Sequence, residues 1–158
     1  METEIEKFIE ESVEKRTKEP QKFYNPERFK PSKNLRVKSI ELTEEYTRID
    51  FHYQSSKIYD NGGWIQIDKG TYIQPVNSSQ KYGLVKAIGI TIAPLKHYFK
   101  RQGEYFTYTL IFPALPKNTT KINIIEREGP GNFFNFYNVQ YSSWMTVPHA
   151  SDLPISNN

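Results

Sequence analysis

Hydrophobic and polar residues alternate with a period of two along most of residues 35–141. In the clearest run, TRIDFHYQ at 47–54, Ile49, Phe51 and Tyr53 fall on one side of an extended chain and polar residues fall on the other. A second run, EYFTYTLIF at 104–112, is apolar or aromatic on both sides, which is typical of a central strand covered on both faces. The alternation predicts strands over this part of the chain.

About eight strands are expected, joined by hairpin-length connections and turn signals, with no helical pattern between them. An irregularity near Ser39 interrupts the first strand, and Gly89 bends the fifth. The pattern predicts an all-β fold, an antiparallel β-sandwich over residues 35–141. The expected strands are 35–42, 47–54, 64–68, 71–75, 82–94, 104–112, 121–126 and 133–141.

A different pattern precedes the strands. Ile5, Phe8, Ile9 and Val13 follow the i, i+3, i+4 and i+8 spacing of one helix face, and Glu19-Pro20 ends the helical pattern. A helix this short is marginal in water by itself, so its apolar face needs a partner. That partner is the protein's own sheet, a second copy or another protein.

Residues 20–34, PQKFYNPERFKPSKN, combine three prolines with aromatic and basic residues. We expect an extended arm that lies on a surface, with Phe23, Tyr24 and Phe29 as its anchors. Residues 142–158 are polar and rich in turn-forming residues, which predicts a flexible C-terminal tail. The expected organisation is a charged helix and arm at 1–34, a β-sandwich at 35–141 and a tail at 142–158.

Several segments occur in an order that resembles a known family. They are GGWIQIDKGTYI (62–73), YGLVKAIGITIAP (82–94), LIFPALPKNT (110–119), KINIIE (121–126) and FNFYNV (134–139). Together they resemble a small bacterial immunoglobulin-like β-sandwich module of uncharacterised function, found alone or within larger, often envelope-associated proteins. The resemblance implies a sandwich with a binding or accessory role and supplies no catalytic residues. It does not extend to residues 1–34, where a partner-specific role would reside.

Composition excludes several classes of protein. The chain has no cysteine, which removes disulfides, thiolate metal sites and cysteine nucleophiles. The net charge is +3 and the mean hydropathy is −0.70, with no apolar run long enough for a membrane span. The first ten residues, METEIEKFIE, lack the pattern of a secretion signal. We therefore expect a cytoplasmic protein if Met1 is the native start, and an envelope-associated one otherwise.

Candidate catalytic groups are few. No nucleophile elbow, metal-binding His-Glu motif or phosphate loop occurs, and His52, His97 and His149 are scattered along the chain. Glu126 and Glu128 end one strand, and Asp60 and Asp68 flank another, but nothing in the sequence makes these carboxylates converge. We predict no catalytic residue, no metal site and no cofactor.

Aromatic residues offer a better basis for function. The alternation in 64–68 turns Ile65 and Ile67 inward and Trp64 outward, and Trp64, Tyr72 and Trp144 are candidates for a ligand platform. The first hypothesis is a non-catalytic protein-binding or assembly module, and its alternative is a carbohydrate- or small-ligand-binding sandwich. In the first, the contact residues are Ile5, Phe8, Ile9, Phe23, Tyr24 and Phe29, and the partner is another protein chain or a second copy.

A basic cluster at 96–101, KHYFKR, raises the question of nucleic acid. Sheet surfaces that bind nucleic acid interleave aromatic and basic residues on one open face, usually with a recognisable motif. No such motif occurs here, so we do not expect nucleic acid as a partner.

Overall fold

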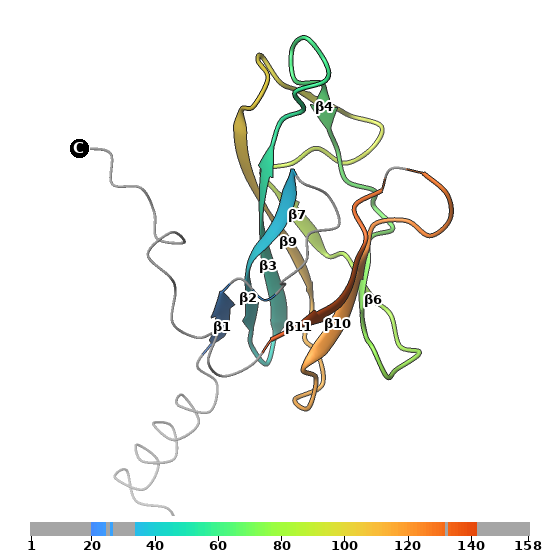
Figure 1. Ribbon diagram of the computed structural model, residues 1–158. Coiled ribbons are helices and arrows are strands. Elements are labelled where there is room, and N and C mark those ends of the chain that lie inside the picture. Colours follow the sequence, from blue (N-terminus) through green and yellow to red (C-terminus); the bar gives the residue numbers. More distant parts are fainter. Residues whose placement is uncertain (1–19, 25, 27–33, 132, 142–158) are drawn as a thin grey trace, which may run out of the picture.

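The computed structural model describes residues 20–24, 26, 34–131 and 133–141, and this part of the chain contains eleven strands and no helix (Figure 1). All strand pairs are antiparallel, and one isolated parallel bridge joins Ile67 to Ile92. The prediction of an antiparallel all-β fold is therefore confirmed. The strands are β1 (Gln21–Tyr24), β2 (Leu35–Leu42), β3 (Tyr46–Gln54), β4 (Trp64–Ile65), β5 (Tyr72–Pro75), β6 (Tyr82–Gly83), β7 (Lys86–Ile88), β8 (His97–Tyr98), β9 (Tyr105–Pro113), β10 (Lys121–Ile125) and β11 (Phe136–Gln140).

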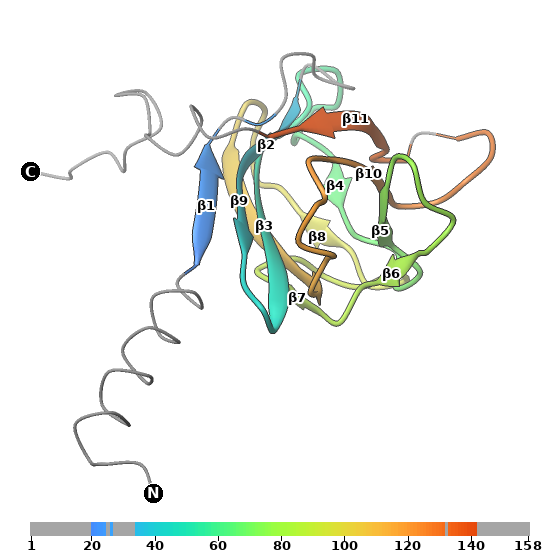
Figure 2. The same cartoon turned by 90° about the horizontal axis from the view of Figure 1, so that it is seen from below.

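The strands form three sheets, two of which enclose the core. A five-stranded sheet has the order β1-β2-β3-β9-β7, a four-stranded sheet has the order β11-β10-β5-β6, and β4 pairs with β8 in a small third sheet. Figure 2 shows the two larger sheets on opposite sides of the domain. This arrangement is consistent with a β-sandwich.

The core lies between these two sheets because each contributes its apolar face. The expected inward residues of β3, Ile49, Phe51 and Tyr53, are all buried. The ring of Phe51 stacks on Tyr108 of β9 at 4.9 Å between centroids and lies 5.8 Å from Phe136 of the opposite sheet. Each large side chain buried in this way contributes about 1.5–3 kcal/mol.

Two strand irregularities adjust how the sheets bend. The register of β2 against β3 shifts between Val37 and Ser39, which confirms the irregularity expected near Ser39. The register of β10 against β11 shifts between Ile122 and Ile124, and Asn138 in β11 adopts a φ of 55°. Extra residues of this kind increase the local twist of a strand.

Two expected strands are divided in the structure. Residues 64–68 form only the two-residue strand β4, followed by the isolated bridge at Ile67. Residues 82–94 give β6 in the four-stranded sheet and β7 in the five-stranded sheet, after which Gly89 takes a φ of 78°. This segment crosses between the sheets, and period-two alternation alone does not distinguish a crossing from a bend.

The sequence predicted that β9 is covered on both faces, but part of its outer face is exposed. The strand lies between β3 and β7, but Tyr105 and Thr107 at its start are exposed. Tyr105, the aromatic residue on this face, thus meets solvent near one end of the sheet.

The chain before β2 also pairs with the sheet. Residues 21–24 of the expected arm form β1, which runs antiparallel to β2 with Phe23 opposite Ile40. The expected helix within residues 1–19 and the tail at 142–158 lie outside the described residues. Within the described ranges, no helix has the length and hydropathy of a membrane span.

Candidate binding surfaces

Most of the exposed large apolar side chains come from two segments of the chain that pair with each other. Nine such side chains are exposed in the described part of the chain, and six of them come from residues 58–64 and 95–105. We call these six residues the aromatic end: Ile58, Tyr59, Trp64, Leu95, Tyr98 and Tyr105. Contiguous exposed apolar surface on a folded domain commonly marks an interaction site.

Backbone and side-chain hydrogen bonds hold the two segments of the aromatic end together. β4 pairs with β8 so that Trp64 lies opposite Tyr98. The backbone N–H of Phe99 donates to the carbonyl of Gly63 at 3.0 Å, and the side-chain amide of Gln102 donates to the carbonyl of Tyr59 at 3.0 Å. The surface is therefore assembled from parts of the chain more than thirty residues apart.

A close backbone approach explains the glycine at position 62. Gly62 has a φ of 84°, and a Cβ added there would lie 2.3 Å from the carbonyl oxygen of Arg101. The hydroxyl of Ser55 donates to this same oxygen at 2.8 Å. Only glycine fits here without strain, so the turn and the segment after β8 stay in contact.

A cluster of aromatic rings lies beneath the aromatic end. It forms because successive side chains of residues 97–99 point to opposite sides of the strand. Tyr98 points outward, whereas the ring of Phe99 is buried against Tyr53 at 5.6 Å and Phe106 at 5.5 Å. The imidazole of His97 stacks on Phe106 at 4.8 Å. His97 is thus part of the packing under the aromatic end, although the sequence grouped it with a surface basic cluster.

Cations without carboxylate partners surround the aromatic end. The ammonium group of Lys96 lies 4.3 Å from the centroid of the Trp64 ring, a cation–π contact. Among the described residues, no carboxylate oxygen lies within 4.0 Å of the charged groups of Lys57, Lys96, Lys100 or Arg101. These charges are available to an anionic partner.

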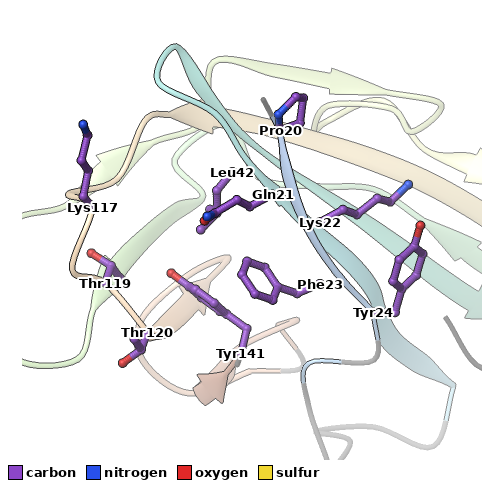
Figure 3. Close-up of a pocket in the computed structure, with 10 residues that line it drawn as sticks. All are labelled: Pro20, Gln21, Lys22, Phe23, Tyr24, Leu42, Lys117, Thr119, Thr120 and Tyr141. Atoms are coloured by element: carbon purple, nitrogen blue, oxygen red, sulfur yellow. The ribbon is translucent and has the colours of Figure 1, made fainter. Parts of the chain in front are cut away.

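A groove lies elsewhere on the domain, between β1 and the turn before β10 (Figure 3). Its volume is about 550 Å³, within the range of small-ligand sites. Phe23 and Tyr141 form its floor, with their ring centroids 4.9 Å apart. Its lining residues are Pro20, Gln21, Lys22, Phe23, Tyr24, Leu42, Lys117, Thr119, Thr120 and Tyr141.

The hydroxyl of Tyr141 is the unusual feature of this groove. The side chain is only 3% exposed, and its hydroxyl has no hydrogen-bond partner in the described part of the chain. Burial raises the pKa of this phenol above its ordinary value, so it stays a neutral donor at physiological pH. Buried hydroxyls without a partner are uncommon in folded proteins, and this one belongs to a residue that lines the groove.

The predicted contact residues have separate places. Phe23 is 8% exposed and packs on Tyr141, so its ring is part of the domain itself. Tyr24 is half-buried at the groove, with the ammonium group of Lys22 5.3 Å from its ring. Ile5, Phe8, Ile9 and Phe29 lie outside the described residues.

The predicted ligand platform is not brought together by the described residues. Trp64 belongs to the small third sheet and Tyr72 to the four-stranded sheet, and no ring contact joins them. The Tyr72 hydroxyl donates to the Glu128 carboxylate, which also lies 3.7 Å from the ammonium group of Lys81. Burial and this hydrogen bond raise the pKa of Tyr72 to about 12. Trp144 lies outside the described residues.

The two most buried carboxylates have structural partners. The Glu126 carboxylate accepts backbone N–H bonds from Asp68 and Phe134, each at 3.0 Å. On the outer face of the five-stranded sheet, Asp50 accepts hydrogen bonds from Thr109 at 2.6 Å and from Ser39 at 3.0 Å. Each carboxylate thus joins separate segments of the fold.

Burial pushes the pKa of Asp50 up, but hydrogen bonds from Thr109, Arg48 and Ser39 and the charge of Arg48 outweigh it and lower the pKa. The carboxylate of Asp50 therefore stays ionised at neutral pH. No group of three or more histidine, aspartate or glutamate side chains in the described ranges is placed to hold a metal ion.

No family model, curated protein or solved structure matches the chain. The surfaces themselves must therefore carry any argument about function. Sequence reasoning identified Trp64 but missed Ile58 and Tyr59, because no periodic pattern marks a loop residue as exposed. It also missed Tyr105, because the strand at 104–112 was expected to be covered on both faces. The nearest signal was the turn sequence DNGG at 60–63, which follows Ile58 and Tyr59 directly.

Proposed function

We propose that the protein is a non-catalytic protein-binding module built on an immunoglobulin-like β-sandwich, with the aromatic end as its main contact surface. The observation that carries this proposal is the concentration of exposed apolar side chains there, six of the nine in the described part of the chain. Tyrosine and tryptophan are enriched in the central contacts of protein interfaces because they offer large, rigid area with a polar handle.

The surroundings of Trp64 favour a protein over a sugar at this surface. Sugar binding uses an open aromatic face, and Lys96 lies over the ring of Trp64. The exposed residues beside it, Ile58 and Leu95, are aliphatic and suit an apolar protein surface. The cations nearby, which have no carboxylate partner within the described ranges, add charge selectivity, which in protein complexes increases association rate and specificity.

A matched pair of tyrosine variants tests this proposal. Tyr98 in the aromatic end is 66% exposed, and Tyr137 on β11 is 63% exposed, so truncation of either has a small effect on folding. The immobilised wild-type protein, Tyr98→Ala and Tyr137→Ala are each incubated with lysate of the native host, and the retained proteins are quantified by mass spectrometry.

We expect a specific protein that the wild type and Tyr137→Ala retain equally and that Tyr98→Ala binds about thirtyfold more weakly, the effect of losing a central aromatic contact of about 2 kcal/mol. Equal retention by all three proteins would show that the aromatic end does not bind the partner. Binding affinity is then measured with the purified partner to exclude indirect capture.

The groove supports a second candidate function, the binding of a carbohydrate or another small amphipathic ligand. The volume of the groove and the aromatic floor that Phe23 and Tyr141 form favour it. A glycan array probed with the wild type, Tyr141→Phe and Lys117→Ala tests the carbohydrate case. Signals that depend on Tyr141 support it, and an array without signal removes carbohydrate from the candidates.

A further inference from the structure

The aromatic end combines apolar side chains with positive charge that no carboxylate in the described part of the chain pairs with, and this combination indicates the chemistry of its partner. On the basis of the proposed function, we propose that it binds an acidic amphipathic segment, residues 2–14 of a second copy of this chain. Two properties of the chain support this occupant: charge complementarity and the apolar pattern of that segment.

Charge complementarity is the first argument. Residues 2–14 contain six glutamates and one lysine, a net charge of −5. Residues 57–64 and 95–105 carry four cations, Lys57, Lys96, Lys100 and Arg101, against the two carboxylates of Asp60 and Glu104, a net charge of +2. The Glu104 carboxylate already accepts the backbone N–H of Lys100 at 3.2 Å, so it is partly engaged. The surface is therefore net positive where the segment is strongly negative, which steers the two together.

The apolar pattern is the second argument. Ile5, Phe8, Ile9 and Val13 of the segment are spaced for one face of a helix, with the glutamates distributed over the rest of its surface. Recognition of an amphipathic helix uses such anchors at i, i+3, i+4 and i+7 or i+8 against an apolar surface rimmed by opposite charge. The aromatic end offers that surface, with Trp64 opposite Tyr98 and with cations beside them.

The place of the acidic segment in the chain favours docking on a second copy over docking on its own domain. The acidic segment precedes Pro20 by six residues, and Pro20 leads directly into β1. β1 and β4 lie towards opposite ends of the domain in Figure 1 and remain apart in Figure 2. As a helix the thirteen residues 2–14 span about 20 Å, and Glu19-Pro20 limits how far they turn back. A segment that docks on a second copy does not have to turn back over its own domain.

This geometry has a consequence for the assembly. The segment and its docking surface are different patches of the chain, so the contact is heterologous, and each added copy exposes a further segment and a further surface. We therefore expect a series of oligomers that grows with concentration.

Sedimentation velocity of the full chain, from low micromolar to millimolar concentration, tests the proposal. The expected result is a weight-average mass that rises above the monomer mass of 18.6 kDa and falls back when salt is raised, because salt screens exposed charges. Tyr98→Ala should raise the dissociation constant about tenfold or more, and Tyr137→Ala should leave it unchanged. A monomer throughout the concentration range, including one whose segment docks on its own domain, overturns the proposal.

A charge exchange identifies the two contacting surfaces. One variant carries Lys96→Glu and Lys100→Glu, and the other carries Glu6→Lys and Glu10→Lys. Each variant alone should associate much more weakly than the wild type. In the first variant the segment and the surface are both negative, and in the second the net charge of the segment falls from −5 to −1, so that little attraction remains. Their mixture should associate, because the acidic segment of the first variant meets the unchanged basic surface of the second.

Association as strong as that of the wild type in each single variant, or a mixture that remains monomeric, overturns the proposed pairing. Circular dichroism of each variant confirms that the sheets are folded before its mass is compared. A chain that does not self-associate overturns this inference but not the proposed function, because capture of another protein through Tyr98 does not require self-association.

Discussion

Glu126 provides a direct test of what holds the loops of this domain together. Its carboxylate is buried, with the residue 7% exposed, and accepts one backbone N–H from Asp68 and one from Phe134. Its own N–H donates to the side-chain oxygen of Asn135 at 2.8 Å. Glu126→Gln keeps the size of the side chain but replaces one acceptor oxygen with an NH₂ donor. One of the two backbone N–H groups then faces a donor.

The expected loss follows from that mismatch. A buried N–H without an acceptor costs about 1–3 kcal/mol, and the lower part of this range applies because Asp68 and Phe134 are only half-buried. Removal of a desolvated charge offsets part of this cost. We expect Glu126→Gln to lose about 1–2 kcal/mol of unfolding free energy at neutral pH. Glu126→Ala loses both bonds and leaves a cavity, so about 3 kcal/mol is expected.

The pKa of Glu126 predicts how the stability difference between the wild type and Glu126→Gln changes with pH. Burial raises the pKa of Glu126 above its ordinary value of 4.5, although the backbone N–H bonds from Phe134 and Asp68 oppose the shift. The native state therefore binds the proton more tightly than the unfolded state. The resulting stability is fully present below pH 4.5 and is lost as the pH rises through the folded pKa. The advantage of the wild type over Glu126→Gln should thus be larger in acid than at neutral pH.

Urea unfolding followed by tryptophan fluorescence between mildly acidic and neutral pH measures both effects. The difference between wild type and Glu126→Gln isolates this residue, because other groups such as Asp50, whose pKa is lowered, titrate in both proteins. A variant as stable as the wild type at every pH, or a wild-type advantage that grows with pH, would refute the reasoning.

Three further substitutions test other features of the fold by thermal or urea unfolding. Tyr108→Phe removes a buried hydroxyl without a partner in the described residues, so stability should stay equal or rise by about 1 kcal/mol; a clear loss would reveal an acceptor. Asp50→Asn weakens the bond from Thr109 and should cost about 1–2 kcal/mol at pH 7, a difference that shrinks in acid as wild-type Asp50 protonates; a constant difference would contradict the lowered pKa. Gly62→Ala meets the Arg101 carbonyl and should cost more than about 2 kcal/mol, whereas an unchanged midpoint would show that the turn moves freely.

The sequence was most informative where a strand has one apolar face. Alternation over 47–54 predicted the inward residues of β3, and Ile49, Phe51 and Tyr53 are buried as expected. The same reasoning turned Trp64 outward and Ile65 inward, and they are 45% and 1% exposed. Such predictions succeed because the side-chain period of a strand is a local property that the core enforces along its whole length.

Features that depend on distant segments were not predictable in this way. Residues 21–24 form an edge strand because β2 pairs with them, and the burial of Phe23 depends on Tyr141, which is more than a hundred residues away in the sequence. The aromatic end likewise joins residues 58–64 to residues 95–105 through β4 and β8. Neither pairing leaves a periodic signal, since β1 has only four residues and β4 and β8 have two each.

The edges of the sheets indicate why recognition should depend on side chains. β6 and β7 have two and three residues, and β1 has four and follows Pro20. β11 carries Asn138 at a φ of 55° beside the register shift in β10. Short or irregular edges give a partner few unpaired backbone groups to extend, and sheet proteins use them to prevent edge-to-edge association. Under the proposed function we therefore expect a partner to be bound through exposed side chains and not by added strand pairing. This is why exposed substitutions at the aromatic end, such as Tyr98→Ala, should change binding while leaving the unfolding free energy close to that of the wild type.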